Sequence, residues 1–87
     1  MDEVLEMILS VLKDHVSSAI LFGSRAKETA TDRSDYDIAV SGVVDYDKLL
    51  EEVDNIDTLY SVDIINLDEC NNKLLVEDVE KYGTKIL

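Results

Sequence analysis

The feature that most constrains the fold is a short, uninterrupted apolar run, Ala19-Ile20-Leu21-Phe22, which ends at Gly23. Four consecutive apolar residues without alternation are typical of a β-strand that is buried on both faces. Two further segments predict strands, at residues 35–41 and 62–67. In the first of these, alternation places Tyr36, Ile38 and Val40 on one face and Asp35, Asp37 and Ala39 on the other.

The segments between these strands have the spacing of amphipathic helices. Residues 2–14 carry apolar side chains at helical intervals, and Asp45 is placed to N-cap a second helix. Asp68 is predicted to cap a last helix that Gly83 ends, before a short edge strand at residues 84–87. The expected faces of the three helices comprise Val4, Ile8, Val11, Leu12 and His15 in the first, Tyr46, Leu49, Leu50 and Val53 in the second, and Leu75, Val79 and Tyr82 in the third.

This order of elements predicts a small α/β (α+β) fold with a mixed β-sheet flanked by helices. The chain has 87 residues, which is the length of one small domain, so we expect residues 1–87 to form a single domain.

The net charge of the chain limits the classes of molecule that it is expected to bind. Eight Lys and Arg against 20 Asp and Glu give a formal net charge of -12, and the basic residues form no dense run. This balance argues against a protein that binds nucleic acid directly by neutralising phosphates, and against one that binds an anionic membrane. With no signal-peptide pattern and a lone cysteine, Cys70, the sequence predicts a soluble, cytoplasmic protein.

Three acidic residues are candidates for chemistry. Asp35 and Asp37 lie two residues apart on a predicted strand, so both carboxylates project from the same face, and Asp63 lies on the next strand. Such hard oxygen ligands suit Mg²⁺, and three convergent carboxylates suit two-metal nucleotidyl transfer. Taken alone the pair also fits a solvated strand face, and a second pair, Asp45 and Asp47, is explained by helix capping.

A second candidate feature follows the first strand. Gly23 permits close approach of the backbone, and Ser24 opens a predicted short helix at residues 24–27 whose free amides and hydroxyl suit phosphate oxygens. Arg25 lies within reach of the same phosphates. Alone, the Gly-Ser pair is more typical of a helix start with a capping serine.

Together these features resemble the minimal nucleotidyltransferase domain of the DNA polymerase beta superfamily. The family motif is Gly-Ser, ten residues, Asp-x-Asp and a third Asp on a later strand. The matching segments are Leu21-Phe22-Gly23-Ser24-Arg25-Ala26, Ser34-Asp35-Tyr36-Asp37-Ile38-Ala39-Val40 and Val62-Asp63-Ile64-Ile65. The resemblance implies that Gly23 and Ser24 hold the triphosphate, that Asp35 and Asp37 bind two Mg²⁺ ions, and that Asp63 completes the site and helps to deprotonate the attacking hydroxyl.

The resemblance also implies a biological role. Stand-alone domains of this kind resemble antitoxins whose partner is a HEPN-domain (higher eukaryotes and prokaryotes nucleotide-binding) ribonuclease, which they adenylylate. We therefore expect transfer of a nucleoside monophosphate, AMP from ATP, to a hydroxyl of a protein partner. The alternative is a non-catalytic acidic module that masks a basic partner. A generic cation-binding acidic domain leaves the spacing between Ser24 and Asp35 unexplained.

Overall fold

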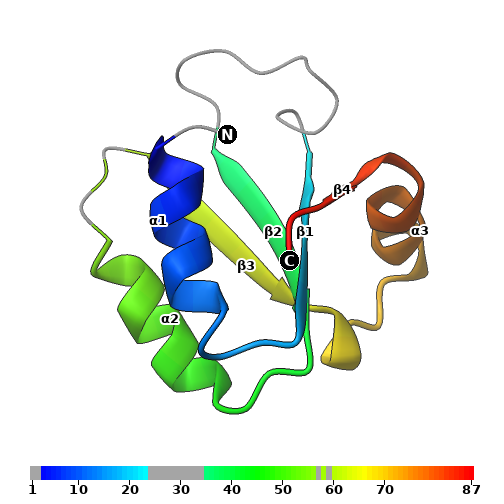
Figure 1. The fold of residues 1–87 in the computed structure, drawn as a ribbon. Helices are drawn as coiled ribbons and strands as arrows, with labels where there is room; N and C mark the ends of the chain where they lie inside the picture. Colours follow the sequence, from blue (N-terminus) through cyan, green and yellow to red (C-terminus); the bar gives the residue numbers. More distant parts are fainter. Residues whose placement is uncertain (1–2, 24–34, 57, 59) are drawn as a thin grey trace.

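The computed structural model describes residues 3–23, 35–56, 58 and 60–87 (Figure 1). Helices and strands follow the predicted order, and their limits lie within about two residues of the predicted ones, except that the last helix begins at Lys73 and not directly after Asp68. The elements are α1 (Glu3–Leu12), β1 (Ser18–Phe22), β2 (Tyr36–Ser41), α2 (Tyr46–Asp54), β3 (Val62–Asn66), the 3₁₀ turn η1 (Leu67–Glu69), α3 (Lys73–Tyr82) and β4 (Thr84–Lys85).

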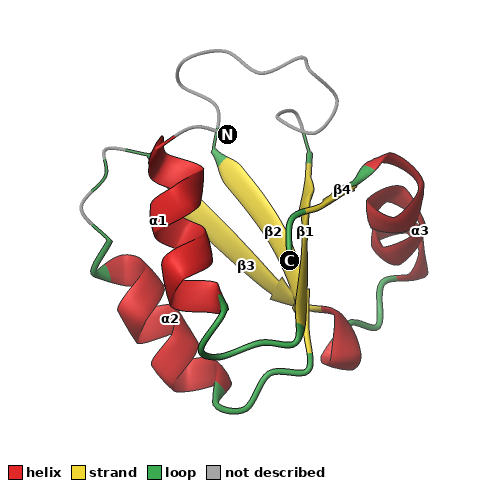
Figure 2. Cartoon of the chain, in the orientation of Figure 1, coloured by secondary structure: helices red, strands yellow, loops and turns green. Residues whose placement is uncertain are grey.

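The sheet has the strand order β3-β2-β1-β4 and is mixed, which confirms the predicted fold class. β1 pairs with β2 and with β4 in the antiparallel sense, whereas β2 and β3 are parallel. Figure 2 shows α1 and α2 side by side over one face of the sheet, with α3 on the other side of β1 and β4. α2 is the crossover between β2 and β3, because two parallel neighbours cannot be joined by a tight hairpin.

The alternation of β2 builds a core on both faces of the sheet. Tyr36, Ile38 and Val40 pack against the buried residues of α1 and α2, while Ala39 packs with Phe22 and Val79 on the α3 face. This is the division that the sequence predicts. The face of α1 is centred on Leu5, Ile8 and Leu12 rather than on Val4 and Val11, which are only half-buried.

One of the two predicted helix caps is correct. Asp45 precedes α2, and its carboxylate accepts a hydrogen bond from the Lys48 amide at 3.2 Å. The prediction that Asp68 caps the last helix is wrong, because the turn η1 intervenes and Asn72 caps α3 by accepting from the Leu75 amide at 3.2 Å. The Asp68 carboxylate instead accepts from the Gly42 amide at 2.8 Å.

The end of α3 also departs in part from the prediction. Gly83 does end the helix, with its amide bonded to the Val79 carbonyl, and a Cβ at this position would collide with that carbonyl and with Ile20. Tyr82, predicted to line the buried face, is 48% exposed, and the Lys81 ammonium lies 5.2 Å from its ring centroid. Only Val79 of the predicted face is fully buried, with Leu75 packed beside it.

Four further side chains, which are conspicuous by residue type, lie elsewhere in the fold. His15 is hydrogen-bonded to Glu52 and so ties the end of α1 to α2, and Cys70 is half-buried. Tyr46 donates to the Ile64 carbonyl at 2.9 Å, and Tyr60 contacts Tyr36 edge to face with ring centroids 5.7 Å apart.

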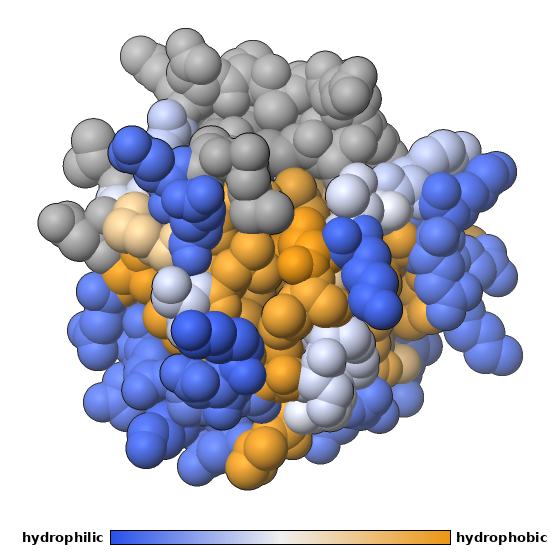
Figure 3. All heavy atoms as spheres, viewed as in Figure 1, coloured by the Kyte–Doolittle hydropathy of each residue, from blue (hydrophilic) through white to orange (hydrophobic). Residues whose placement is uncertain are grey.

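The surface separates by polarity. On the face seen in Figure 3, hydrophilic side chains cover the outer sides of the helices, and hydrophobic ones gather between α1 and α3. Within the described part of the chain, no helix has the length and apolar character needed to cross a membrane.

Candidate active site at the ends of β1, β2 and β3

Two of the three predicted carboxylates lie side by side. Asp37 on β2 and Asp63 on β3 are register partners in a parallel pair, so their side chains project from the same face of the sheet. Asp63 is exposed and Asp37 is half-buried, and a hydrogen bond joins the two side chains. A hydrogen bond between two carboxyl groups requires a proton on one of them, so this contact favours the protonated form of Asp37.

Asp35, the third predicted carboxylate, is exposed and immediately precedes β2. Burial, followed by the negative charges of Asp63 and then Asp35, raises the pKa of the Asp37 carboxyl above its usual value. Its hydrogen bond with Asp63 acts in the same direction. Repulsion among the three groups is therefore centred on Asp37, and a bound cation or proton would relieve it.

Gly23 lies against this acidic pair. It follows Phe22, which is the register partner of Asp37 on β1, and its φ is +76°, a conformation that favours glycine. A Cβ at position 23 would collide with the Asp37 carboxylate and lie 3.2 Å from its Cγ. Only glycine lets the backbone approach the carboxylate this closely. Gly23, Asp37 and Asp63 thus form a row across three neighbouring strands.

Ser24 and Arg25, with the predicted short helix at residues 24–27, lie outside the described residues. Their assignment to phosphate binding remains a prediction.

The donor set of the row suits a hard cation such as Mg²⁺, which takes one or two protein carboxylates together with substrate phosphates and water. Asp37 and Asp63 are the pair best placed to hold it, and Asp35 stands at the same end of β2. In the described part of the chain, three acidic, His or Cys side chains nowhere converge as a ready-made metal cage. A shared ion held by two carboxylates and a triphosphate needs no such cage.

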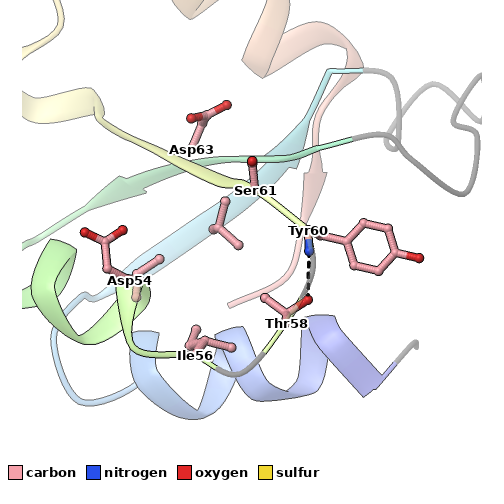
Figure 4. A pocket seen from close by; sticks show the side chains of 8 residues that line it. Asp54, Ile56, Thr58, Tyr60, Ser61 and Asp63 are labelled. Atoms are coloured by element: carbon pink, nitrogen blue, oxygen red, sulfur yellow. Dashed lines mark hydrogen bonds between the residues drawn. The ribbon is translucent and has the colours of Figure 1, made fainter.

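A hollow that sequence reasoning missed adjoins the row. Its volume is about 280 Å³, and it lies between the end of α2 and the start of β3, lined by Val53, Ile56 and Thr58 among others. In Figure 4, Asp63 and Ser61 point to one side of β3, while Ile56 and Thr58 lie on the other side. No sequence signal marks this hollow, because it depends on how the chain after α2 returns to the sheet.

Comparison with known families decides the identity of the fold. The family described as "Polymerase beta, Nucleotidyltransferase" matches residues 6–87 of the chain. The chain belongs to the polymerase beta nucleotidyltransferase family. This membership makes it a nucleotidyltransferase and confirms the predicted resemblance.

Solved structures agree with this membership. A chain in the crystal structure of a toxin-antitoxin with AMP-PNP is similar to it at 26% identity and a TM-score of 0.66, with 92% of this chain and 69% of that chain covered. The toxin-antitoxin MntA-HpeT, crystallised as a mutant with two Asp-to-Glu replacements two positions apart, gives 24% identity, a TM-score of 0.65 and the same coverage, 92% and 69%. No curated protein shows significant sequence similarity to the chain.

The close approach at Gly23 predicts a specific effect of Gly23→Ala. Alanine at this position is strained by the left-handed backbone, and its Cβ displaces the Asp37 carboxylate. The substitution should therefore lower the free energy of unfolding, measured in urea, by about 1 kcal/mol or more. Gly42→Ala is the matched control, since Gly42 has a φ of +67° but its Cβ would meet Ser17 instead. Both variants should lose stability. We expect Mg²⁺ with AMP-PNP to raise the Tm of the wild type and of Gly42→Ala, but not that of Gly23→Ala. Equal rises in the two variants would contradict the site.

The raised pKa of Asp37 predicts how the stability of the metal-free nucleotidyltransferase depends on pH. Between the usual Asp pKa and the raised one, the folded state binds more protons than the unfolded state, so the free energy of unfolding falls as pH rises. Asp37→Asn removes this dependence and should therefore stabilise the protein more at pH 7 than at pH 4, measured by urea unfolding. Asp47→Asn, on the exposed side of α2, is the control for the loss of one carboxylate away from the row. A gain from Asp37→Asn that is no larger at pH 7 than at pH 4 would refute the assignment.

Proposed function

We propose that this nucleotidyltransferase transfers AMP from ATP to a hydroxyl group of a protein partner, the toxin of a toxin-antitoxin pair. The observation that carries the proposal is the row of Gly23, Asp37 and Asp63, which places a close backbone turn beside two adjacent carboxylates in a chain of this family.

Each predicted site residue has a role in the proposed reaction. Gly23 and Ser24 bind the triphosphate, and Arg25 offsets its charge. Asp35, Asp37 and Asp63 are the proposed ligands of two Mg²⁺ ions, which when bound neutralise the triphosphate and lower the pKa of the attacking hydroxyl. The carboxylate of Asp63 helps to take up the proton of that hydroxyl. The hydroxyl oxygen bonds to the α-phosphorus as the bond from that phosphorus to the bridging oxygen breaks, and pyrophosphate leaves.

The choice of ATP and of a toxin partner rests on the neighbour crystallised as a toxin-antitoxin with AMP-PNP, an analogue of ATP. By resemblance, the toxin is a HEPN-domain protein and the chain is its antitoxin. The net charge of -12 suits a basic protein surface, and it opposes direct binding of nucleic acid or of an anionic membrane. Such a pair would act in the cytoplasm.

The acidic charge also supports a second function, in which the chain neutralises the toxin by covering it without catalysis. The two functions differ in their need for the carboxylates that are proposed to bind Mg²⁺. Catalysis requires Asp35 and Asp37, whereas masking by the whole acidic surface changes little when two of the 20 acidic residues are lost.

We expect the protein, incubated with α-labelled ATP, Mg²⁺ and the protein encoded beside its gene, to label that partner. Asp35→Asn combined with Asp37→Asn should reduce labelling at least about a hundredfold, because metal catalysis contributes several kcal/mol to such transfers.

The matched control is Asp45→Asn combined with Asp47→Asn, the same change at the same spacing on α2. Asn caps a helix as well as Asp does, so this control should fold and label normally. If the Asp35/Asp37 variant still labels the partner, the catalytic proposal is wrong. If it does not label but still silences the toxin fully in cells, masking is the function.

A further inference from the structure

One edge of the sheet is left open beside the catalytic row. β3 is the terminal strand, and the Tyr36 amide donates to the Ser61 carbonyl at 2.9 Å. With Tyr36 and Val62 as register partners, this bond fixes which main-chain groups of β3 face β2. The main chain of Ser61, Asp63 and Ile65 is directed to β2, so that of Val62 and Ile64 is directed outward.

Of the two outward-facing positions of β3, Ile64 is hydrogen-bonded to α2 and Val62 is open. The Ile64 carbonyl accepts a hydrogen bond from the Tyr46 hydroxyl at 2.9 Å, which covers this part of the edge with α2. Burial and then the charge of Glu69 raise the pKa of Tyr46, which keeps its hydroxyl a donor. Among the described residues, none hydrogen-bonds the outward main chain of Val62. An exposed strand edge of this kind is a template for pairing with another chain.

The hollow described above lies along this open part of the edge. Val62 lines it together with Val53 and Ile56, and Asp54, Thr58 and Ser61 make most of its exposed lining polar. The side chains of Asp54, Thr58 and Ser61 are labelled in Figure 4. Its volume, about 280 Å³, is just below the range of about 300–1,000 Å³ usual for small-molecule sites. It therefore suits a side chain of a docked segment better than a whole nucleotide.

A strand added at this edge would continue the catalytic row. Neighbouring residues in adjacent strands project side chains from the same face, with Cβ atoms about 4.5–5.5 Å apart. The residue of the added segment that lies beside Asp63 would therefore share the face of Asp63 and Asp37. The triphosphate is proposed to bind at the Gly23 end of the row. A hydroxyl on that residue would lie at the opposite end, beyond Asp63.

The charge of the edge selects the class of segment. Asp54 lines the hollow, and Asp63 flanks it on the other side of the open edge, both exposed. A ribonucleotide end would bring phosphates against these carboxylates, whereas Lys or Arg side chains of a polypeptide would be attracted. The main chain of Val62 also offers the N–H and C=O that an extended peptide, but not RNA, can pair with in register.

We propose that the open edge of β3 at Val62 receives an extended, cationic segment of the protein partner and presents its acceptor hydroxyl beside Asp63. This inference rests on the proposed function, since it names the kind of acceptor that the site takes. It adds a docking interaction that does not itself require transfer.

The test measures docking with the full chain, Mg²⁺ and AMP-PNP, so that no transfer takes place. The probes are synthetic peptides of about nine residues, long enough for a strand, with a central Tyr, Ser or Thr between alternating Lys and Val. A matched set carries Glu in place of Lys, and a ribo-oligonucleotide serves as the nucleic-acid probe. We expect only the Lys peptides to slow hydrogen exchange of the Val62 amide, by about tenfold or more, as followed by NMR.

Two pairs of variants locate the contact. Val62→Pro removes the outward N–H without removing a sheet hydrogen bond and should weaken peptide binding about fivefold, while Val62→Thr should not. Asp54→Lys should weaken binding of the Lys peptides about threefold or more. Glu51→Lys makes the same change of charge at another exposed position of α2 and should not weaken binding.

Protection that is absent at Val62, equal effects of Asp54→Lys and Glu51→Lys, or stronger binding of the oligonucleotide at this edge would each overturn the docking proposal. Its failure is distinguishable from that of the proposed function. Labelling of the partner without an effect at Val62 would refute the docking edge alone. Docking at Val62 without any labelling of the partner would refute nucleotidyl transfer and leave the edge as a binding surface.

Discussion

The parallel pairing of β2 with β3 runs in register from Tyr36 and Val62 to Val40 and Asn66, and it places Asp37 directly beside Asp63. A slip of one residue would move Asp63 to the opposite face of the sheet. The register is fixed by burial, because Ile38 and Val40 fill the core under α1 and α2 while Ala39 fills the smaller core under α3. The row of Gly23, Asp37 and Asp63 and the open edge at Val62 both follow from this pairing.

The same pairing works against stability. Burial of Asp37, together with the charges of Asp63 beside it and of Asp35 near the same strand end, raises the pKa of the Asp37 carboxyl and makes its charged form unfavourable in the metal-free protein. A chain of 87 residues has a small core to offset this repulsion. Adjacent carboxylates that lower the stability of the ligand-free protein are typical of a site that binds a cation. Cation binding, rather than solubility alone, would explain why these acidic residues lie together.

Much of this arrangement is predictable from the sequence because it depends on local patterns. The alternation of residues 35–41 predicts which face carries Asp37, and the cap at Asp45 follows from one side chain and the helix after it. The errors have non-local causes. Asp68 and Asn72 are equally good caps, and only the turn η1, with Asp68 bonded to Gly42, decides between them. Tyr82 fits the periodicity of α3, but it is the last residue of the helix and is 48% exposed. The hollow beside Val62 depends on the path of the chain after α2, which no pattern of residues encodes.

The central claim is that the row of Gly23, Asp37 and Asp63 binds a divalent cation together with a nucleoside triphosphate. The most direct measurement replaces Mg²⁺ with Mn²⁺ in the presence of AMP-PNP and follows the paramagnetic broadening of backbone amide signals by NMR. The account predicts that the amides of Gly23, Asp37 and Asp63 broaden first, at metal concentrations that leave Asp45 and Asp47 on α2 unaffected. Broadening that begins at Asp45 and Asp47, or that is uniform over the acidic surface, would contradict it.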